Sequence, residues 1–202
     1  MSDGYFRIAD SPAVKAAQLE YGSRPARTQA APPPSGPEPR DPLTESEREF
    51  LALRDGFYLA SVSGTGWPYV QFRGGPAGFV RVLDAHALAW ADFRGNRQYI
   101  STGNITDNDR VALFFMDYPH RARLKIYGRA SLLDVRARPD LQEGLLAAGY
   151  RAIIERMVTV TVVSYDWNCP QHITPRFTIE ELDSLLGPSW RQPATAREEH
   201  ER

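Results

Sequence analysis

The chain has 202 residues, which is enough for one domain with flanking segments and a buried core. Its formal net charge of −1 predicts no general attraction to nucleic acid or to a membrane surface. The single cysteine excludes an internal disulfide framework, and no apolar stretch approaches the roughly 18 residues of a membrane span. We therefore expect a cytoplasmic protein that binds neither nucleic acid nor membrane.

Residues 1–42 are typical of an arm rather than of a folded domain. Within them, Ser11–Tyr21 has the composition of a helix. The proline-rich segment Ala30–Pro42 cannot form a helix or an interior strand. We predict a folded domain at 43–187 and a flexible C-terminal tail at 188–202.

A helix is predicted to open the domain, because Thr44 and Glu47 have the spacing of a capping box. In that motif, the Thr44 side chain accepts a hydrogen bond from the Glu47 amide, and the Glu47 carboxylate reaches back to Thr44. Phe50, Leu51 and Leu53 are expected to face inward from this helix.

Beyond this helix, apolar residues alternate with a period of two, which is typical of short antiparallel strands. The first four segments are separated by short turns, and none of these connections is long enough for a parallel crossover. The predicted strands are Phe57–Ser63, Tyr69–Arg73, Phe79–Leu83, Ala87–Asp92, Val111–Asp117, Ala122–Val135 and Met157–Trp167. The sequence therefore predicts a mainly β protein with flanking helices, built as a small antiparallel barrel.

Further helices are predicted towards the C-terminus. Leu141–Ala148 and Arg151–Glu155 have helical composition and lie between the last two strands. Thr178–Glu181 repeats the capping-box pattern and is expected to start a short helix that ends at Leu186.

The segment Asp92–Arg97, DFRGNR, follows a strand that is expected to be buried. It places Arg94, Asn96 and Arg97 on one loop, where guanidinium groups and loop amides are suited to a phosphate monoester. No nucleotide-binding glycine motif accompanies this loop. The alternative is a solvated turn with surface arginines, and the spacing leaves both interpretations open.

Two predicted strands present polar side chains on one face. Arg121, Arg123 and Lys125 alternate along the first, so they either hold an anion or form an exposed face that pairs with nearby acids. Gln71 and Arg73 share a face of the second strand. The two glycines that follow them either leave room for a ligand or mark a bulge.

The segment Asp166–Arg176, DWNCPQHITPR, gathers an aromatic ring, amides and an arginine on a loop that two prolines stiffen. Trp167 is suited to stacking on a flat heterocycle, and Gln171 and Arg176 are suited to hydrogen bonds with its polar edge. In the alternative, the loop is a structural clasp in which Trp167 fills the core and Arg176 pairs with a carboxylate.

No catalytic residue and no metal site is assigned from the sequence. Cys169 has no second cysteine to pair with, and its nearest base, His172, lies beyond a proline. Metal-ligand spacing is absent among the histidines, which are His86, His120, His172 and His200.

The order of these segments resembles the pyridoxamine 5′-phosphate oxidase-like family, the FMN-binding split β-barrels. The resemblance runs from about Thr44 to Val135, and more loosely to Arg176. It is carried by the helix TESEREFL, the hairpin FYLASVSGTGWPYVQFRGG, the block GNRQYISTGNITDNDRVALFFMD with a short helix inside it, and the strand RLKIYGRASLL.

This resemblance implies an FMN-dependent oxidoreductase that acts as a homodimer, with two FMN sites at the subunit interface and a small-molecule substrate. By position, it places three groups of residues at the cofactor: Gln71, Phe72 and Arg73 beside the isoalloxazine; Arg94, Asn96 and Arg97 at the phosphate, with Arg123 or Lys125 nearby; and Trp167, Gln171 and Arg176 next to the flavin of the partner subunit.

Two motifs of the pyridoxamine phosphate oxidases proper are absent. Their Arg-apolar-apolar-Leu-Lys pattern is replaced by Gln71–Gly75, and their C-terminal Arg-x-His signature is missing. Pyridoxamine phosphate is therefore not the expected substrate. Two alternatives stay open: a non-enzymatic FMN-binding module, and a haem-handling protein on the same barrel with His120 or His172 as the iron ligand.

Overall fold

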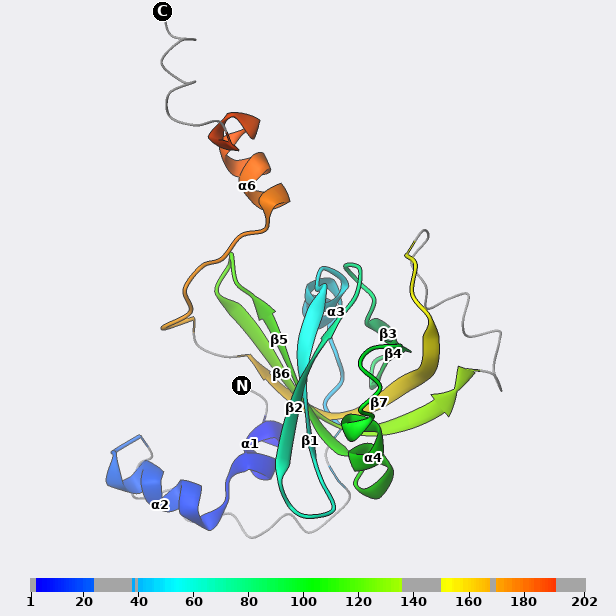
Figure 1. Ribbon diagram of the computed structural model, residues 1–202. Helices are drawn as coiled ribbons and strands as arrows, with labels where there is room; N and C mark the ends of the chain where they lie inside the picture. Colours follow the sequence, from blue (N-terminus) through cyan, green and yellow to red (C-terminus); the bar gives the residue numbers. More distant parts are fainter. Residues whose placement is uncertain (1–2, 24–37, 39, 136–149, 168–169, 192–202) are drawn as a thin grey trace, which may run out of the picture. The chain divides into compact units, whose positions relative to one another are not determined.

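The computed structural model describes residues 3–23, 38, 40–135, 150–167 and 170–191 (Figure 1). By its internal packing, the chain divides into two compact units. The first comprises Met1–Met116 and Arg123–Asn168, and the second comprises Asp117–Ala122 and Cys169–Arg202. Each unit is described by itself.

One sheet dominates the first unit, and its neighbouring strands pair antiparallel. In the described residues it has seven strands in the order β2-β1-β5-β6-β7-β4-β3. Because β2 and β3 stand at opposite ends of this order, the barrel is split rather than closed, which confirms the predicted fold. The strands are β1 (Gly56–Val62), β2 (Pro68–Gly74), β3 (Arg81–Asp84), β4 (Ala87–Phe93), β5 (Arg110–Asp117), β6 (Ala122–Asp134) and β7 (Ile154–Trp167).

The hydrophobic core lies on the inner face of this sheet. Phe57 and Phe115 are cross-strand partners whose rings stack with centroids 4.8 Å apart. The ring of Trp90 meets Phe57 edge-on at 5.1 Å. All three side chains are buried, and burying a large apolar side chain contributes about 1.5–3 kcal/mol each. The period of two thus fixes which residues of each strand face the core.

The helix α3 (Glu45–Ala52) carries the predicted capping box. The Thr44 amide donates to the Glu47 Oε2 atom at 2.9 Å. Leu51 is buried, as predicted, but the prediction for Leu53 was wrong, because this side chain is 68% exposed. The helix ends at Ala52, so Leu53 no longer lies on its inward stripe.

The N-terminal arm contains two helices, of which one was predicted. Helix α2 (Pro12–Glu20) begins after Ser11, whose side chain accepts a hydrogen bond from the Val14 amide. Helix α1 (Asp3–Ala9) precedes it and was not predicted. Tyr5 of α1 is 8% exposed, so tertiary contacts hold this short helix rather than its own propensity.

The predicted helix at Arg151–Glu155 was wrong. Ile154 and Glu155 begin β7, and Ile154 is the register partner of Phe93 on β4. Pairing with a neighbouring strand therefore overrides the local helical composition. The other predicted helix of this region, Leu141–Ala148, lies outside the described residues. A short helix, α4 (Ile100–Asp107), occupies the block where the family resemblance implied one.

The second unit contains the predicted C-terminal helix, α6 (Ile179–Leu186). Its capping box is formed, since the Thr178 amide donates to Glu181 at 2.7 Å and the Glu181 amide donates to Thr178 at 3.2 Å. A 3-10 helix, η2 (Pro188–Arg191), follows at the start of the predicted tail, and the rest of that tail lies outside the described residues. None of the helices in the described ranges has the length and hydrophobicity needed to cross a membrane.

Candidate functional site

A small polar cleft, with a volume of about 40 Å³, lies where β2 approaches the end of β4 across the split of the barrel. Strands β2, β4 and β7, the loop after β4 and helix α4 supply its walls. The cleft brings together four of the predicted residues, Gln71, Arg73, Asn96 and Arg97. Its other lining residues are Asp92, Phe93, Gly95, Tyr99, Thr102, Glu155 and Arg156.

The first carboxylate of the cleft, Asp92, binds two arginines. Arg73 donates from Nη1 to Asp92 Oδ1 at 2.5 Å, which links β2 to β4 across the split. Arg156 donates from Nε and Nη2 to Asp92 Oδ2 at 3.0 and 2.9 Å. Asp92 is 3% exposed, so its charge needs these partners to offset the cost of burial.

The second carboxylate, Glu155, lies at the start of β7. It accepts hydrogen bonds from Arg94 Nε at 2.9 Å, from the Tyr99 hydroxyl at 3.1 Å and from Arg156 Nη2 at 3.3 Å. The hydrogen bond from Arg94 is the main cause that lowers the pKa of Glu155, and Tyr99 and Arg156 add to the effect. Arg94 is therefore held beside the cleft as the partner of a carboxylate.

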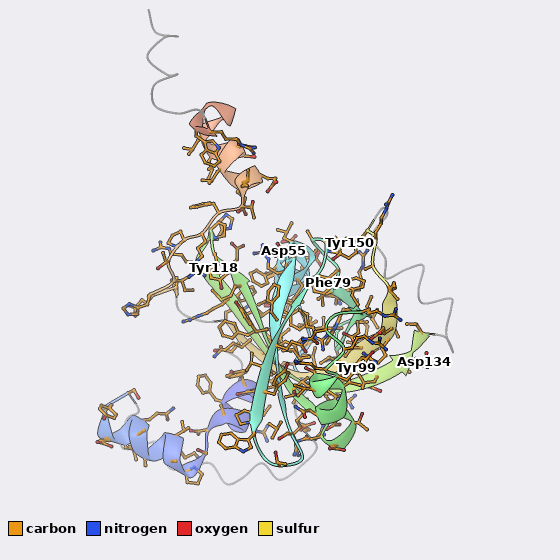
Figure 2. The ribbon with its side chains drawn as sticks, in the orientation of Figure 1. Asp55, Phe79, Tyr99, Tyr118, Asp134 and Tyr150 are labelled. Atoms are coloured by element: carbon orange, nitrogen blue, oxygen red, sulfur yellow. The ribbon has the colours of Figure 1, made fainter. Side chains whose placement is uncertain are left out.

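Arg97 differs from the other arginines of the cleft. Its Nε atom lies 3.4 Å from the Tyr99 hydroxyl, a contact that raises the pKa of Arg97, and within the described ranges it pairs with no carboxylate. The backbone is left-handed at both residues, with φ of 62° at Arg97 and 54° at Tyr99. Such strained positions are frequent at functional sites. Helix α4 begins directly after Tyr99 (Figure 2), and the first amides of a helix have no partner within the helix itself.

The charges of the cleft are unbalanced in favour of the cations. Four guanidinium groups and two carboxylates lie in and beside it: Arg73, Arg94, Arg97 and Arg156 against Asp92 and Glu155. In addition, the Arg73 Nε atom is buried without a hydrogen-bond partner among the described residues. An excess of positive charge, a spare buried donor and the start of a helix are features that suit an anion.

Three other predicted positions on β2 and β6 do not line the cleft: Phe72, Arg123 and Lys125. Phe72 points to the opposite side of β2 from Gln71, and its ring covers two glycines. A Cβ atom added at Gly56 would lie 2.4 Å from the Phe72 ring, and one added at Gly74 would lie 2.9 Å from it. Lys125 forms an ion pair with Asp166 at 3.4 Å.

Arg123 shares β6 with Lys125, and neither residue lines the cleft. The structure therefore does not bring these two cations to Arg97. Gln71 does line the cleft, and its side-chain oxygen accepts a hydrogen bond from Ser101 of α4 at 2.9 Å.

Trp167 is partly buried against the core and contacts helix α3, and its predicted role beside a flavin stays a prediction. Its indole Nε1 donates to Glu47 Oε1 at 2.7 Å, and its ring meets Phe50 edge-on at 4.8 Å. The Tyr165 hydroxyl also donates to Glu47, at 3.2 Å. Burial raises the pKa of Glu47, but the hydrogen bonds from Thr44, Trp167 and Tyr165 outweigh it, so the pKa is lowered.

Gln171 and Arg176 belong to the second unit. The Arg176 guanidinium lies 4.9 Å from the centroid of the Tyr118 ring, and among the described residues it pairs with no carboxylate. The predicted roles of both residues beside a flavin stay predictions. The other predicted alternative, a haem ligand, also stays one: His120 is 80% exposed, and its Nδ1 lies 2.9 Å from Asp117.

Several residues of the cleft were not predicted as site residues. Tyr99 lies on the loop itself, whereas Glu155 and Arg156 become its neighbours only through the pairing of β4 with β7. A signal was present for Asp92, which places a charge in an otherwise apolar strand. Within the described part of the chain, no three His, Cys, Asp or Glu side chains gather as they would around a metal ion.

Comparison with solved structures finds several similar folds. HupZ of Group A Streptococcus is 15% identical over 67% of this chain and 100% of that chain, with a TM-score of 0.48. General Stress Protein 26 of Bacillus anthracis is 13% identical over 64% and 92% of the two chains, with a TM-score of 0.45. An FMN-binding protein of Syntrophomonas wolfei is 11% identical over 60% and 83%, with a TM-score of 0.47.

Comparison with proteins of curated function finds no significant sequence match. Comparison with protein families gives a match to the family of pyridoxamine 5′-phosphate oxidase over residues 43–167. The match covers the sheet from β1 to β7, helix α3 that precedes it and every residue that lines the cleft. Because it also spans more than half of the sequence, this chain belongs to the pyridoxamine 5′-phosphate oxidase family.

Proposed function

We propose that this protein is an FMN-dependent oxidoreductase that acts on a small molecule as a homodimer, with two FMN sites at the subunit interface. The observation that carries the proposal is Arg97, a protonated guanidinium that pairs with no carboxylate of the described chain and lies in a cleft with excess positive charge. Family membership supports the same assignment.

The donors of the cleft fit a phosphate monoester. Arg97 offers charge and paired N–H groups, and the first amides of α4 offer further donors. The Asn96 Oδ1 atom accepts the Gln98 amide at 3.2 Å, which orients the Asn96 amide group on the same loop. These groups would hold the phosphate of FMN. When bound, FMN supplies the hydride or electron transfer, and the chain supplies binding, orientation and electrostatics.

The size of the cleft restricts what it can enclose. A volume of about 40 Å³ is little more than the share of one water molecule, which is about 30 Å³ in the liquid. The ring system of a flavin would therefore extend beyond this cleft, past Gln71 on β2. Gln71 is itself fixed by Ser101, so its amide is held ready at that edge. A second subunit would supply the missing wall, as the proposed homodimer requires.

The test is to change Arg97→Gln and to measure FMN affinity by fluorescence quenching. We expect binding to weaken by about 10- to 100-fold, because a charge-assisted pair of hydrogen bonds is lost. The matched control is Arg81→Gln, an exposed arginine on β3 that does not line the cleft. Equal FMN affinity in the Arg97 variant and the control, at equal thermal stability, would reject the phosphate site.

A second measurement separates the enzyme from a non-enzymatic FMN-binding module. The protein loaded with FMN is mixed with NADH or NADPH without oxygen, and the flavin absorbance is followed before and after air is admitted. Bleaching and reoxidation through repeated cycles support the oxidoreductase. A flavin spectrum that no reductant bleaches supports the module, and a Soret band in the purified protein supports the haem alternative.

A further inference from the structure

Three of the four arginines at the cleft are neutralised by its two carboxylates. Asp92 binds both Arg73 and Arg156. Glu155 binds Arg94 at 2.9 Å. The fourth arginine pairs with no carboxylate of the described chain, although it lies in the same cleft. Its own neighbours must therefore keep it from forming an ion pair.

Tyr99 stands between this fourth arginine, Arg97, and Glu155. The Arg97 Nε–H group donates to the Tyr99 oxygen at 3.4 Å, and the Tyr99 hydroxyl donates to Glu155 Oε1 at 3.1 Å. The charge of Glu155 still contributes to the raised pKa of Arg97, so the carboxylate is near enough to compete for the guanidinium. One hydroxyl group therefore separates Arg97 from a direct ion pair.

The position of the Tyr99 ring does not depend on its hydroxyl alone. The Arg156 guanidinium lies 4.9 Å from the centroid of the ring, which is a cation–π contact (Figure 2). The backbone is left-handed at Tyr99 and at Arg97, and residues other than glycine keep this conformation where the surrounding contacts enforce it. Removal of the hydroxyl alone should therefore leave the ring in place.

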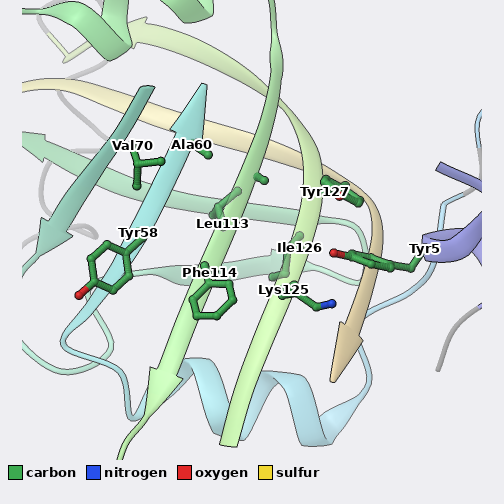
Figure 3. A pocket seen from close by; sticks show the side chains of 10 residues that line it. Tyr5, Tyr58, Ala60, Val70, Leu113, Phe114, Lys125, Ile126 and Tyr127 are labelled. Atoms are coloured by element: carbon green, nitrogen blue, oxygen red, sulfur yellow. The ribbon is translucent and has the colours of Figure 1, made fainter. Parts of the chain in front are cut away.

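Lys125 shows how a cation pairs when no hydroxyl intervenes. It lines a mostly apolar hollow of about 350 Å³ on another part of the sheet, where its Nζ atom lies 4.4 Å from the centroid of the Tyr5 ring (Figure 3). The Tyr5 hydroxyl is hydrogen-bonded to Tyr127 instead. Nζ reaches Asp166 Oδ2 directly at 3.4 Å, and the charge of Lys125 is neutralised.

We propose that Tyr99 is a positioning residue that keeps Arg97 available for the phosphate by preventing its ion pair with Glu155. This inference rests on the proposed function and deepens it. The hydroxyl occupies one N–H group of the guanidinium, at Nε, and leaves the Nη1 and Nη2 groups to donate two parallel hydrogen bonds to an anion. A carboxylate in the same place would occupy a pair of donors and would repel the phosphate.

The test is a double-mutant cycle on Tyr99 and Glu155, with FMN affinity measured by fluorescence quenching. Tyr99→Phe keeps the ring and lets Arg97 pair with Glu155, so we expect FMN binding to weaken by about 5- to 10-fold. Glu155→Gln removes the competing charge. In that background, Tyr99→Phe should change the affinity by less than about 2-fold. A tyrosine that only supports the loop would weaken binding equally in both backgrounds.

Riboflavin, which lacks the phosphate, shows whether the effect passes through Arg97. Its affinity should be the same for the wild type and for Tyr99→Phe. The matched control is Tyr150→Phe, because Tyr150 is 41% exposed against 39% for Tyr99 and does not line the cleft. This control should bind FMN as the wild type does. Circular dichroism and thermal unfolding check the fold of each variant.

Three results would overturn the inference. In the first, Tyr99→Phe binds FMN as tightly as the wild type. In the second, it weakens FMN and riboflavin alike. In the third, Glu155→Gln does not suppress the effect of Tyr99→Phe.

Arg97→Gln is measured in the same series, so that the two proposals fail separately. If it weakens FMN binding while Tyr99→Phe does not, the phosphate site stands and the inference fails. If the wild type binds no FMN, the cofactor is rejected, and inorganic phosphate followed by calorimetry takes its place as the probe. The same pattern of phosphate affinities across the cycle then supports the inference, and a wild type that binds no phosphate overturns it.

Discussion

At the scale of single residues, Glu47 connects helix α3 with the last strand of the sheet. It is 4% exposed and lies on α3, yet it accepts hydrogen bonds from Tyr165 and Trp167 of β7 as well as from Thr44. One carboxylate thus caps a helix and fastens that helix to the last strand. Trp167 is held by this contact, and we therefore regard its position as structural.

We predict that Glu47→Gln lowers the free energy of unfolding by about 2–3 kcal/mol at pH 7, measured by urea denaturation. Glutamine offers one acceptor oxygen in place of two. Its NH₂ group would face Thr44, Tyr165 or Trp167, which are themselves donors to this side chain. Glu49→Gln, an exposed position on the same helix, is the control and should change little.

The pH dependence gives a second check on Glu47. Its folded-state pKa lies below the ordinary value of 4.5, so its stabilising effect is present above that value and is lost as the pH falls through the folded-state pKa. The wild type should therefore lose stability more steeply than Glu47→Gln below about pH 4.5. Parallel pH profiles for the two proteins would contradict this account.

Secondary-structure elements were predictable where the signal is local. The period of two identified every strand, and the capping boxes at Thr44 and Thr178 located the starts of two helices. The misses depend on contacts that are distant in the sequence. Helix α1 is held by the stacking of Tyr5 on Tyr127, and Ile154 is a strand residue because it pairs with Phe93.

The same distinction applies to the candidate site. Arg97, Asn96 and the β2 pair could be predicted, because a polar loop after a buried strand and alternation along a strand are both visible in the sequence. The carboxylate partner of Arg94 could not be predicted from the sequence. Glu155 reaches Arg94 only because β4 pairs with β7. Lys125 was misleading, since the sequence shows its charge but not its partner Asp166.

The turn between β2 and β3 packs closely against helix α3. Gly78 has a φ of +74°, and a Cβ added there would lie 2.8 Å from the Ala52 carbonyl oxygen. Gly66, in the β1–β2 hairpin, has a φ of +87° and no atom within 4 Å of an added Cβ. The two glycines share the backbone strain and differ in space.

We predict that Gly66→Ala costs about 1 kcal/mol of folding free energy and that Gly78→Ala costs about 2–4 kcal/mol. Thermal and urea denaturation of both variants give the comparison. If the two variants have the same free energy of unfolding, the close contact between the turn and α3 does not contribute to stability.

For the whole molecule, the two units differ in what stabilises them. The main hydrophobic core belongs entirely to the first unit. In the second unit, helix α6 has no buried residue, and Ile179, Leu185 and Leu186 are 53%, 64% and 60% exposed. A helix of 8 residues is too short to be stable alone, since about 12–15 residues are needed even for good helix formers.

We predict that amide hydrogens of α6 exchange within seconds, whereas those of β6 and β7 are protected close to the level of global unfolding. Hydrogen exchange followed by mass spectrometry measures both regions in one experiment. Protection of α6 equal to that of β7 would contradict this prediction and would mean that another surface covers its apolar side chains in solution.

Strand β2 alternates polar residues that line the cleft with apolar residues on its opposite face. The number of residues inserted into or deleted from this strand therefore decides which set faces the cleft. One residue inserted at the turn end of β2 would turn Gln71 and Arg73 to the face of the sheet opposite the cleft and would bring Val70 and Phe72 towards Asp92. Two inserted residues would restore the orientation. This edge of the barrel should therefore tolerate many substitutions during divergence, while insertions and deletions within it persist mainly in pairs.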